Sequence, residues 1–468
     1  YKDYLLFYRI GDFYEMFYDD AKVASRELDL TLTGKDCGEK ERAPMCGVPF
    51  HASEGYIGKL IEKGFKVAIC EQTEDPATAK GLVRREVIRV VTPGTVLETN
   101  LLSETKNNYL CTVYVGEFAS GIAFADVSTG QVFGTSLDGA EMLSDLKNEI
   151  ATYSPSEIIF NISLSKAPDI ADFVSQRTGA LVTDNEPSRF ERDGAAERIR
   201  AQFGDEGAEK AAESGALTAA VGALLGYVSE TQKGDISYIK EFDVYSGGQY
   251  LRMDANTRRN LELTETMRTK EKRGSLLWVL DKTRTSAGAR MLRKWIEKPL
   301  LSEKAIKQRQ GAVRDFAGDF MLREETSELL SGVLDLERLI SKIVYGTANA
   351  KDLRAVANTV RLIPELKNLL SKCESDEMKR IVAEGKPIRE DFLTRSCPIP
   401  EQEAFSKYLL RIEGLRESAL VLMTTEHPFT TNFGANDVRV TTHYFEDNFI
   451  SNIFSTLHEG GHALYELN

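Results

Sequence analysis

The pattern of apolar residues changes near Gly247, and this change constrains the fold more than any other feature of the sequence. Before it, short apolar runs typical of strands alternate with helical patterns, whereas after it long segments repeat their apolar residues every three to four positions. Alternating strands and helices predict α/β domains, and an unbroken helical period predicts an all-α region. With 468 residues, the chain is long enough for about three domains.

The part before Gly247 is predicted to form two α/β domains, at residues 1–95 and 107–240. The turn sequence Thr92–Thr95 marks the boundary between them. In the first domain, strands are predicted at Leu5–Ile10, Lys66–Cys70 and Val87–Val91, and helices at Tyr18–Leu28 and Ser53–Lys63. The second domain opens with three glycine-broken runs of β-branched and aromatic residues, which predict a three-stranded meander.

The third predicted domain, residues 245–381, is all-α, and a fourth segment covers residues 382–468. Helices are predicted at Leu276–Trp295, Glu303–Phe320, Leu329–Val344 and Ala350–Leu370. Strand patterns are not found after Gly247, so the fourth segment is also expected to be mainly α-helical.

Composition excludes several classes of protein. No run of 18 apolar residues is present, and the first residues lack the features of a signal peptide, so we expect no membrane contact. Six cysteines without a C-x-x-C pair are typical of reduced thiols, which predicts a cytoplasmic location. The sequence contains no G-x-x-x-x-G-K-[ST], so we expect no ATP site of that kind. The first residue is not Met, which predicts that the chain begins within a longer protein.

Charge is distributed unevenly along the chain. The net charge is −13, yet Arg252–Lys304 contains 14 Lys or Arg and 7 Asp or Glu. Two interpretations are open for this local excess. It is either a solvated helical face or a surface that lies close to phosphates.

The stretch F-Y-R-I-G-D-F-Y-E-M-F-Y-D-D, Phe7–Asp20, combines many aromatic residues with acidic ones. Its composition alone predicts a strand and a helix that bury Phe13 and Phe17. The stretch also resembles the mismatch-recognition segment of the MutS family of DNA mismatch repair proteins. The resemblance continues, in the family's order, through Pro44–Ala52, Val67–Gly81, Arg89–Thr95, Leu251–Leu263 and Ser275–Ile296, and it covers residues 1 to about 381.

The resemblance implies a mismatch-binding domain, an RNase H-like connector and a helical lever, in that order. It implies that Phe13 wedges into mismatched double-stranded DNA and that Glu15 hydrogen-bonds a displaced base. An inserted ring unstacks a base step at a cost of a few kcal/mol, and a mispaired base lowers that cost. A carboxylate is repelled by phosphates, so Glu15 would disfavour intact duplex. Tyr14 is expected to face the core.

The family's clamp, the return of its lever and its ATPase do not follow in this sequence. The resemblance therefore predicts weak mismatch binding, without encirclement of DNA and without nucleotide-driven signalling.

Histidines gather at the C-terminal end, where four of the five lie in the last 42 residues. His458, Glu459 and His462 form H-E-x-x-H, in which two imidazoles four residues apart on a helix can share one zinc ion. The intervening glutamate would deprotonate a zinc-bound water. The alternative is a pair of surface histidines on a helix.

A second resemblance begins near residue 382. Its motifs are Gly385–Leu393, Glu403–Leu410, Glu426–Phe433, Asp437–Thr442 and the H-E-x-x-H segment. These resemble the carboxypeptidase Taq family of zinc metallocarboxypeptidases. The resemblance implies a substrate-proximal His427 and an Arg439 that grips a substrate carboxylate, although a salt bridge with Asp437 is the alternative for Arg439.

The family's third zinc ligand, a glutamate well downstream, is missing from this sequence. Glu466 lies roughly 12 Å along a helix axis from His458, too far to join the same ion. His443 or Glu446 would approach only through a fold that the sequence does not define. We therefore expect weak or no Zn²⁺ binding, and a peptide substrate only if the fragment is active.

Three hypotheses follow. The first is a truncated mismatch-binding protein, and the second is a zinc-dependent metallocarboxypeptidase. The third is a chimeric chain, in which two unrelated genes are joined near residues 373–386. We favour the third for the origin of the chain and the first for its function.

Overall fold

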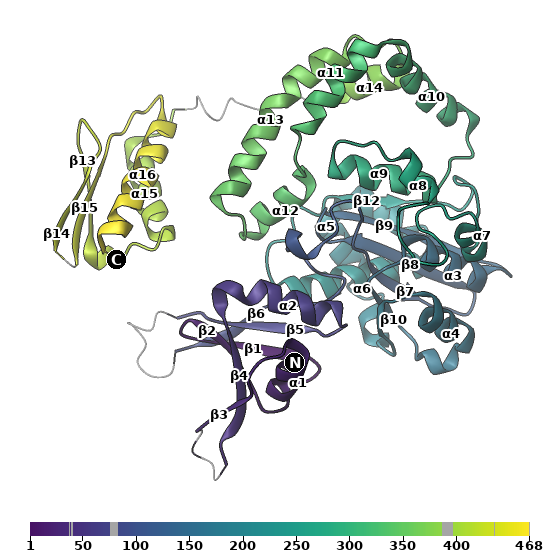
Figure 1. Ribbon diagram of the computed structural model, residues 1–468, viewed down its shortest axis with the longest axis horizontal. Coiled ribbons are helices and arrows are strands. Elements are labelled where there is room, and N and C mark those ends of the chain that lie inside the picture. Colours follow the sequence, from purple (N-terminus) through teal and green to yellow (C-terminus); the bar gives the residue numbers. More distant parts are fainter. Residues whose placement is uncertain (37, 39–40, 75–82, 386–395, 435, 468) are drawn as a thin grey trace. The chain divides into compact units, whose positions relative to one another are not determined.

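The computed structural model describes residues 1–36, 38, 41–74, 83–385, 396–434 and 436–467. The chain forms two compact units, Tyr1–Val382 and Ala383–Asn468 (Figure 1). Residues 75–81 and 386–393, which belong to two of the resemblance motifs, lie outside the described residues. Among the helices that are described, none is both long enough and apolar enough to span a bilayer.

A six-stranded sheet with the order β3-β4-β2-β1-β5-β6 forms the first domain. Its strands are β1 (Leu5–Ile10), β2 (Phe13–Phe17), β3 (Thr33–Lys35), β4 (Ala43–Pro49), β5 (Val67–Gln72) and β6 (Arg85–Val91). Its helices are α1 (Tyr18–Leu28) and α2 (Ser53–Glu62), with the short 3-10 turn η1 (Phe50–Ala52) before α2.

Alternation along the strands divides this sheet into two faces. Phe7, Tyr14 and Met16 are buried and share one core with Leu28 of α1 and Leu60 of α2. The residues between them on β2 are less buried. The sheet therefore has one face against the core and a second, more open face.

A second six-stranded sheet, with the order β11-β10-β7-β8-β9-β12, forms the next domain. The strands are β7 (Leu110–Tyr114), β8 (Ala119–Asp126), β9 (Gln131–Asp138), β10 (Glu157–Phe160), β11 (Leu181–Thr183) and β12 (Glu241–Val244). The longer helices are α3 (Met142–Tyr153), α4 (Pro168–Arg177), α5 (Ala195–Ala212) and α6 (Gly215–Gln232). The predicted meander is β7-β8-β9, whose neighbouring strands pair antiparallel.

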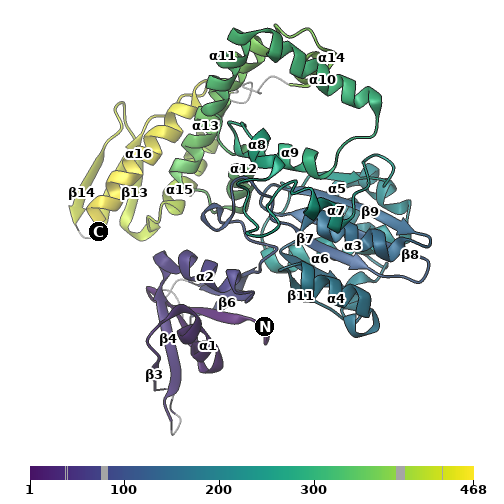
Figure 2. The same cartoon turned by 45° about the vertical axis from the view of Figure 1, so that its right-hand side comes forward.

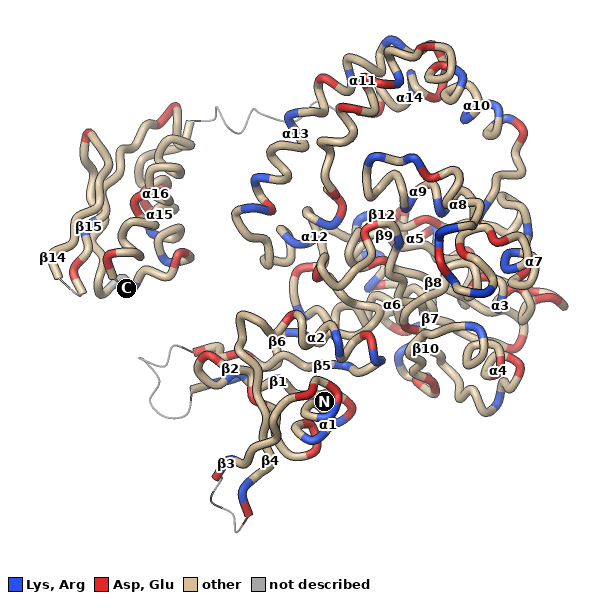
Figure 3. Tube along the Cα trace, in the orientation of Figure 1, with Lys and Arg blue, Asp and Glu red and all other residues tan. Residues whose placement is uncertain are grey.

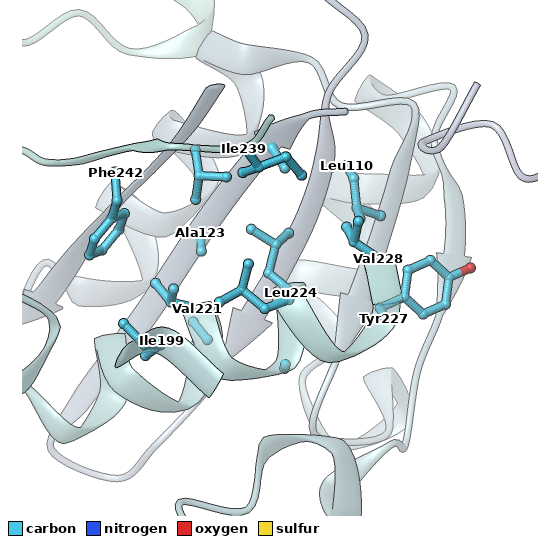
Figure 4. Close-up of a cluster of buried hydrophobic side chains, with 14 of the residues drawn as sticks. Leu110, Ala123, Ile199, Val221, Leu224, Tyr227, Val228, Ile239 and Phe242 are labelled. Carbon is cyan, nitrogen blue, oxygen red and sulfur yellow. The ribbon is translucent and has the colours of Figure 1, made fainter. Parts of the chain in front are cut away.

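Helix α6 packs against the middle of this sheet. Val221, Leu224 and Val228 meet strand residues such as Leu110 and Ala123 in one buried cluster (Figure 4). At Gly121 of β8 an added Cβ would collide with the backbone of Ala216. A glycine is therefore required where the helix lies closest to the strand.

The rest of the first unit is helical. Its helices are α7 (Ala255–Asn260), α8 (Leu276–Leu280), α9 (Ser286–Glu297), α10 (Glu303–Gly318), α11 (Phe320–Ser331), α12 (Leu336–Tyr345), α13 (Ala350–Leu370) and α14 (Asp376–Glu384). Helices α11 and α13 lie side by side (Figures 1 and 2).

Two of the predicted helices are interrupted in the structure, because polar residues inside them act as caps. In the segment predicted as one helix, Leu276–Trp295, Asp281 Oδ1 accepts a hydrogen bond from Thr283 Oγ1 at 2.6 Å, and Thr285 Oγ1 accepts one from the Gly288 amide at 3.0 Å. Asp335 likewise caps a new helix inside the predicted Leu329–Val344, whereas the predicted Glu303–Phe320 is observed as α10 to within two residues.

Many large apolar side chains of the helical region are exposed. They include Trp278, Val279, Trp295, Val313, Phe320, Met321, Ile340 and Leu353. These residues are distributed over the six helices α8 to α13. Two of them have a cation over the ring, since the Arg309 guanidinium lies 3.8 Å from the centre of the Trp295 ring and that of Arg323 lies 5.1 Å from the centre of Phe320.

The second unit places two helices on a small sheet. The strands β13 (Leu420–Thr424), β14 (Thr430–Gly434) and β15 (Asp437–Thr442) have the order β13-β15-β14. Helices α15 (Ile399–Ile412) and α16 (Phe449–Leu467) pack on this sheet, where Val438 and Val440 meet Leu410 and Ala463. The expectation that strand patterns end at Gly247 was wrong here, because the alternating V-R-V of β15 is a strand pattern with one buried face. Helical residues still outnumber strand residues in the described part of this unit, since α15 and α16 have 14 and 19 residues and the strands have 5, 5 and 6.

Candidate nucleic-acid interface and the C-terminal histidine pair

Phe13 and Glu15 lie on the open face of the first sheet. Both are on β2, separated by the buried Tyr14, so their side chains point to the same side. Their direct neighbours on the adjacent strands, which share this face, are Tyr8, Ile10, Gly47 and Pro49. The expectation that Tyr14 faces the core is confirmed, since its side chain is only 7% exposed.

Phe13 projects from the first position of its strand. The ring is 47% exposed, although an apolar residue of this size on a strand is usually buried. Gly11, with a φ of +55°, forms the turn from β1 into β2 just before it. Composition alone predicted a buried Phe13, and this interpretation was wrong.

Glu15 is held in place by Lys35. The Lys35 ammonium donates a hydrogen bond to Glu15 Oε2 at 2.5 Å and lies 5.4 Å from the centre of the Phe17 ring. On the neighbouring strand, an added Cβ at Gly47 would lie 3.6 Å from Glu15 Cγ. The carboxylate therefore has a fixed position beside a cation and above a residue without a side chain.

Two further cations stand at the end of the same sheet. The Arg9 guanidinium lies 3.7 Å from the centre of the Phe50 ring, and the Arg85 guanidinium lies 5.2 Å from that of Tyr8. Arg85 Nε also donates to the Arg9 carbonyl at 3.0 Å. Arg85, which stacks on Tyr8, is suited to phosphates, because Arg donors match phosphate oxygens. Arg9 is the strand partner of the buried Tyr14 and pairs with Glu71, so it supports the sheet from the other face.

On the buried face of the sheet, Tyr14 of β2 contacts Glu71 of β5. Its hydroxyl donates a hydrogen bond to Glu71, which Arg9 Nη1 also approaches at 3.4 Å. Burial, followed by the hydrogen bond to Glu71, raises the pKa of Tyr14 above its usual range. The buried network fixes β2 against its neighbours and so positions the open face.

Sequence reasoning missed Lys35, Arg9 and Arg85 as members of this region. No local pattern marks Lys35, which lies 20 residues from Glu15. Only the pairing of β2, β3 and β4 brings the two side chains together.

The C-terminal histidines lie on one exposed side of α16. The ring centres of His458 and His462 are 4.7 Å apart. Glu459, between them, is 8% exposed and faces the sheet, where its Oε2 accepts a hydrogen bond from Thr430 Oγ1 at 2.7 Å. The helix therefore presents the two imidazoles to solvent and directs the carboxylate elsewhere.

Arg439 lies on the opposite face of the small sheet from α16. Its neighbours Val438 and Val440 face the helices, so Arg439 points away from them. Its guanidinium pairs with Asp437 at 3.3 Å and stacks on Phe433 at 4.4 Å. This is the internal salt bridge that the sequence left open as the alternative to substrate binding.

The remaining residues considered for this site are dispersed. His427 is exposed in the loop between β13 and β14, and its carbonyl accepts a hydrogen bond from Thr425 Oγ1. His443 Nδ1 contacts the Thr425 carbonyl at 2.9 Å. Within the described residues, no group of three or more His, Cys, Asp or Glu side chains is arranged to hold a metal ion.

Comparison with known protein families gives three matches. Residues 1–100 match MutS domain I, residues 108–240 match MutS domain II, and residues 256–416 match MutS domain III. The match to domain III thus continues into the second compact unit, which begins at Ala383.

Individual relatives agree with these matches. The chain is 50% identical over 376 residues to the DNA mismatch repair protein MutS of Acetivibrio thermocellus. This alignment covers 80% of this chain and 43% of that protein. It is 49% identical over 379 residues to the MutS of Ruminiclostridium cellulolyticum. That alignment covers 81% of this chain and 43% of the relative. The chain therefore spans less than half the length of these relatives. Up to about residue 380, it carries domains I, II and III of the MutS family.

Proposed function

We propose that residues 1–95 recognise mismatched double-stranded DNA, with Phe13 as the inserting wedge. The observation that carries this proposal is the 47% exposure of a phenylalanine ring on the open face of the sheet. Leaving about half of that side chain in water forgoes roughly 0.7–1.5 kcal/mol of burial, which a base stack would supply on binding. A mispaired step is easier to open than a paired one, so insertion favours the mismatch.

Glu15 would supply discrimination on the same face. Its carboxylate is two residues from the wedge and accepts a hydrogen bond from Lys35. A displaced base with a free N–H could donate to the second carboxylate oxygen. An intact duplex keeps its Watson–Crick N–H groups paired and brings phosphates towards the negative charge, so it would be disfavoured.

The proposal is limited to DNA binding. The DNA mismatch repair proteins that this chain resembles are more than twice the length that it matches. We assign no ATP-dependent step to the residues present, and we expect the affinity for mismatched DNA to be weak.

The test is fluorescence anisotropy with a labelled duplex carrying one central G·T pair and with its fully paired counterpart. We expect the unaltered chain to prefer the G·T duplex, and Phe13→Ala to abolish this preference. The matched control is Phe118→Ala, which removes an exposed ring, 82% accessible, from the turn between β7 and β8. Equal binding of both duplexes by the unaltered chain would refute the proposal.

A zinc carboxypeptidase is the second candidate function, for residues 382–468. It is favoured by one observation, the adjacent and exposed imidazoles of His458 and His462. The other residues do not fit a catalytic zinc ion, because Glu459 faces Thr430 and Arg439 lies across the sheet. We therefore derive no peptidase step, and we limit the metal proposal to weak Zn²⁺ binding by the two histidines.

Metal analysis of the purified chain tests this second candidate. We expect Zn²⁺ added in excess to be lost on dialysis. One zinc ion per chain that survives dialysis, and that disappears in His458→Ala, would instead support a complete site. Asn432→Ala, a substitution on the adjacent strand β14 that leaves both imidazoles intact, is the control.

We further propose that residues 382–468 have a separate origin from the preceding part. The compact units divide between Val382 and Ala383, and the relatives align over 372 to 386 residues of this chain. The MutS domain III match to residue 416 argues for a less abrupt junction. Independent sequencing across codons 373–390 distinguishes two ways in which the parts could have been joined, since a continuous reading frame in every read would exclude an assembly error and leave a fused gene.

A further inference from the structure

A basic cavity lies between the second domain and the helices that follow it. It encloses about 350 Å³ and is lined by the end of α3, the end of α4, and helices α7 and α9. Eight of its lining side chains are Lys or Arg and two are Glu. In a chain with a net charge of −13, this concentration of positive charge is opposite to the overall balance.

The cavity collects much of the basic excess found between Arg252 and Lys304. Six of its eight cations come from that segment, and Lys106 and Arg177 join them from elsewhere in the chain. Figure 3 shows Lys and Arg along α9 and around α7. The fold thus brings cations that are distant in the sequence together as lining residues of one cavity.

Part of this charge has no partner. Among the described residues, Arg258 Nη1 and Arg293 Nε are buried without a hydrogen-bond partner. Arg258 uses its Nε on the Met253 carbonyl at 3.2 Å, and Arg293 Nη1 reaches Glu297 at only 3.5 Å. Buried donors left unsatisfied each cost roughly 1–3 kcal/mol.

Glu297 does not neutralise the site fully. Burial raises the pKa of Glu297, although Arg293, Arg258 and Lys106 oppose the rise. Burial also lowers the pKa of Arg258. Arg290 is already paired with Asp335 and Glu337. Among the remaining lining residues cations still outnumber anions, and such a region gains from an added anion.

We infer that this cavity binds a compact anion with two or more phosphate groups. Arg258 and Arg293 supply free donors, and Arg259 and Lys294 supply further positive charge at the same wall. Phosphate oxygens accept several hydrogen bonds at once, which suits guanidinium forks. The volume is that of a small-molecule pocket and is too small for a duplex. The inference does not depend on the proposed mismatch binding, because Phe13 and Glu15 do not line the cavity.

Calorimetric titration of the full 468-residue chain tests the inference with three probes: inorganic pyrophosphate, ADP and adenosine. Binding of pyrophosphate alone would identify free polyphosphate as the ligand, and tighter binding of ADP would identify a nucleotide. We expect adenosine not to bind. Arg258→Gln and Arg293→Gln should each weaken pyrophosphate binding about tenfold, the loss of one charge-assisted hydrogen bond.

Arg268→Gln is the matched control, because Arg268 is exposed in the same segment and does not line the cavity. It should bind pyrophosphate as the unaltered chain does. A thermal melt with and without pyrophosphate guards against misfolding, since a bound ligand raises the melting temperature. Absence of pyrophosphate binding at millimolar concentration would overturn the inference. Equal weakening of pyrophosphate binding by Arg258→Gln, Arg293→Gln and Arg268→Gln would also overturn it. The same holds if Arg258→Gln loses binding to paired duplex while the unaltered chain binds no pyrophosphate.

Discussion

Lys35 and Glu15 form an ion pair on the open face of the first sheet, with Nζ 2.5 Å from Oε2. The two residues come from different strands, β3 and β2, and β4 lies between those strands in the sheet. The side chain of Lys35 is 37% exposed and that of Glu15 is 17% exposed. The pair therefore couples the proposed discriminating carboxylate to a cation that DNA could also reach.

The first prediction concerns this pair. Lys35→Met should weaken binding of both mismatched and paired duplex, because it removes a cation and leaves the Glu15 charge facing phosphates unopposed. Glu15→Gln in the same background should restore most of the loss. Anisotropy titrations of the two single variants and the double variant give the interaction free energy between Lys35 and Glu15 in DNA binding, which we expect to be about 1 kcal/mol. Additive effects would mean that the two side chains act independently on DNA.

A second prediction concerns two buried arginines that hold the segment between the first two domains. Arg338 donates to the carbonyls of Ser103 and Lys106 at 2.9 and 3.0 Å. Arg290 donates to the Glu104 carbonyl at 3.0 Å. Arg338→Met should lower the free energy of unfolding by about 2–4 kcal/mol, since two charge-assisted bonds are lost and two carbonyls are left without donors.

Urea denaturation measures this effect through tryptophan fluorescence, because both tryptophans, Trp278 and Trp295, belong to the helical region. Arg361→Met, an exposed substitution on α13, is the control and should change stability by less than about 0.5 kcal/mol. Similar stability of the Arg338 and Arg361 variants would show that the carbonyl contacts do not contribute.

The third prediction is a pH dependence caused by Lys298. Its ammonium donates to Glu149 Oε2 at 3.0 Å and lies 3.7 Å from the centre of the Tyr245 ring. Burial lowers the pKa of Lys298 to about 8 from its ordinary 10.5, although Glu149 opposes the shift. Between these two values the unfolded chain binds more protons than the folded one, so the free energy of unfolding increases with pH.

From pH 7.5 to pH 9.5, the gain should be about 1–2 kcal/mol relative to Lys298→Met, which cannot titrate. Other groups titrate alike in both proteins and cancel in the difference. The range stops below pH 10, because burial raises the pKa of Tyr245 and Tyr153 and reverses the trend when unfolded tyrosines ionise. If the free energy of unfolding of Lys298→Met changes with pH as that of the unaltered chain does, Lys298 is not the cause of the pH dependence.

A fourth prediction follows from the exposed apolar side chains of the helical region. The folded chain should bind the dye ANS, because Phe320 and Met321 are 61% and 62% exposed among other apolar residues. The double variant Phe320→Glu, Met321→Glu should reduce the fluorescence, whereas Phe118→Glu in the second domain should not. Unchanged fluorescence in the double variant would place the dye site elsewhere.

Local sequence patterns were sufficient to predict the bounds of several helices and strands. The strand Leu5–Ile10 and the helices Tyr18–Leu28 and Ala350–Leu370 have the bounds that their patterns predict. Periodicity failed where a side chain caps a new helix inside a predicted one, as at Asp335, because a cap changes the backbone without interrupting the apolar repeat. It also missed β15, whose alternation covers only a few residues.

The candidate interface could be predicted only in part. The family resemblance singled out Phe13 and Glu15, and the structure places both on one face. Lys35 could not be found from the sequence, because its position depends on strand register. At the C-terminus, spacing alone placed His458 and His462 on one side of α16 but could not show that Glu459 faces Thr430.

The most direct test of the central claim uses 2-aminopurine placed next to a G·T pair, since its fluorescence rises when the base leaves the stack. We predict that the unaltered chain increases this fluorescence at saturating concentration. Phe13→Ala should give no increase at the same fractional saturation, because the wedge is absent. An equal increase with Phe13→Ala would contradict the account, because the base would then leave the stack without the ring of Phe13.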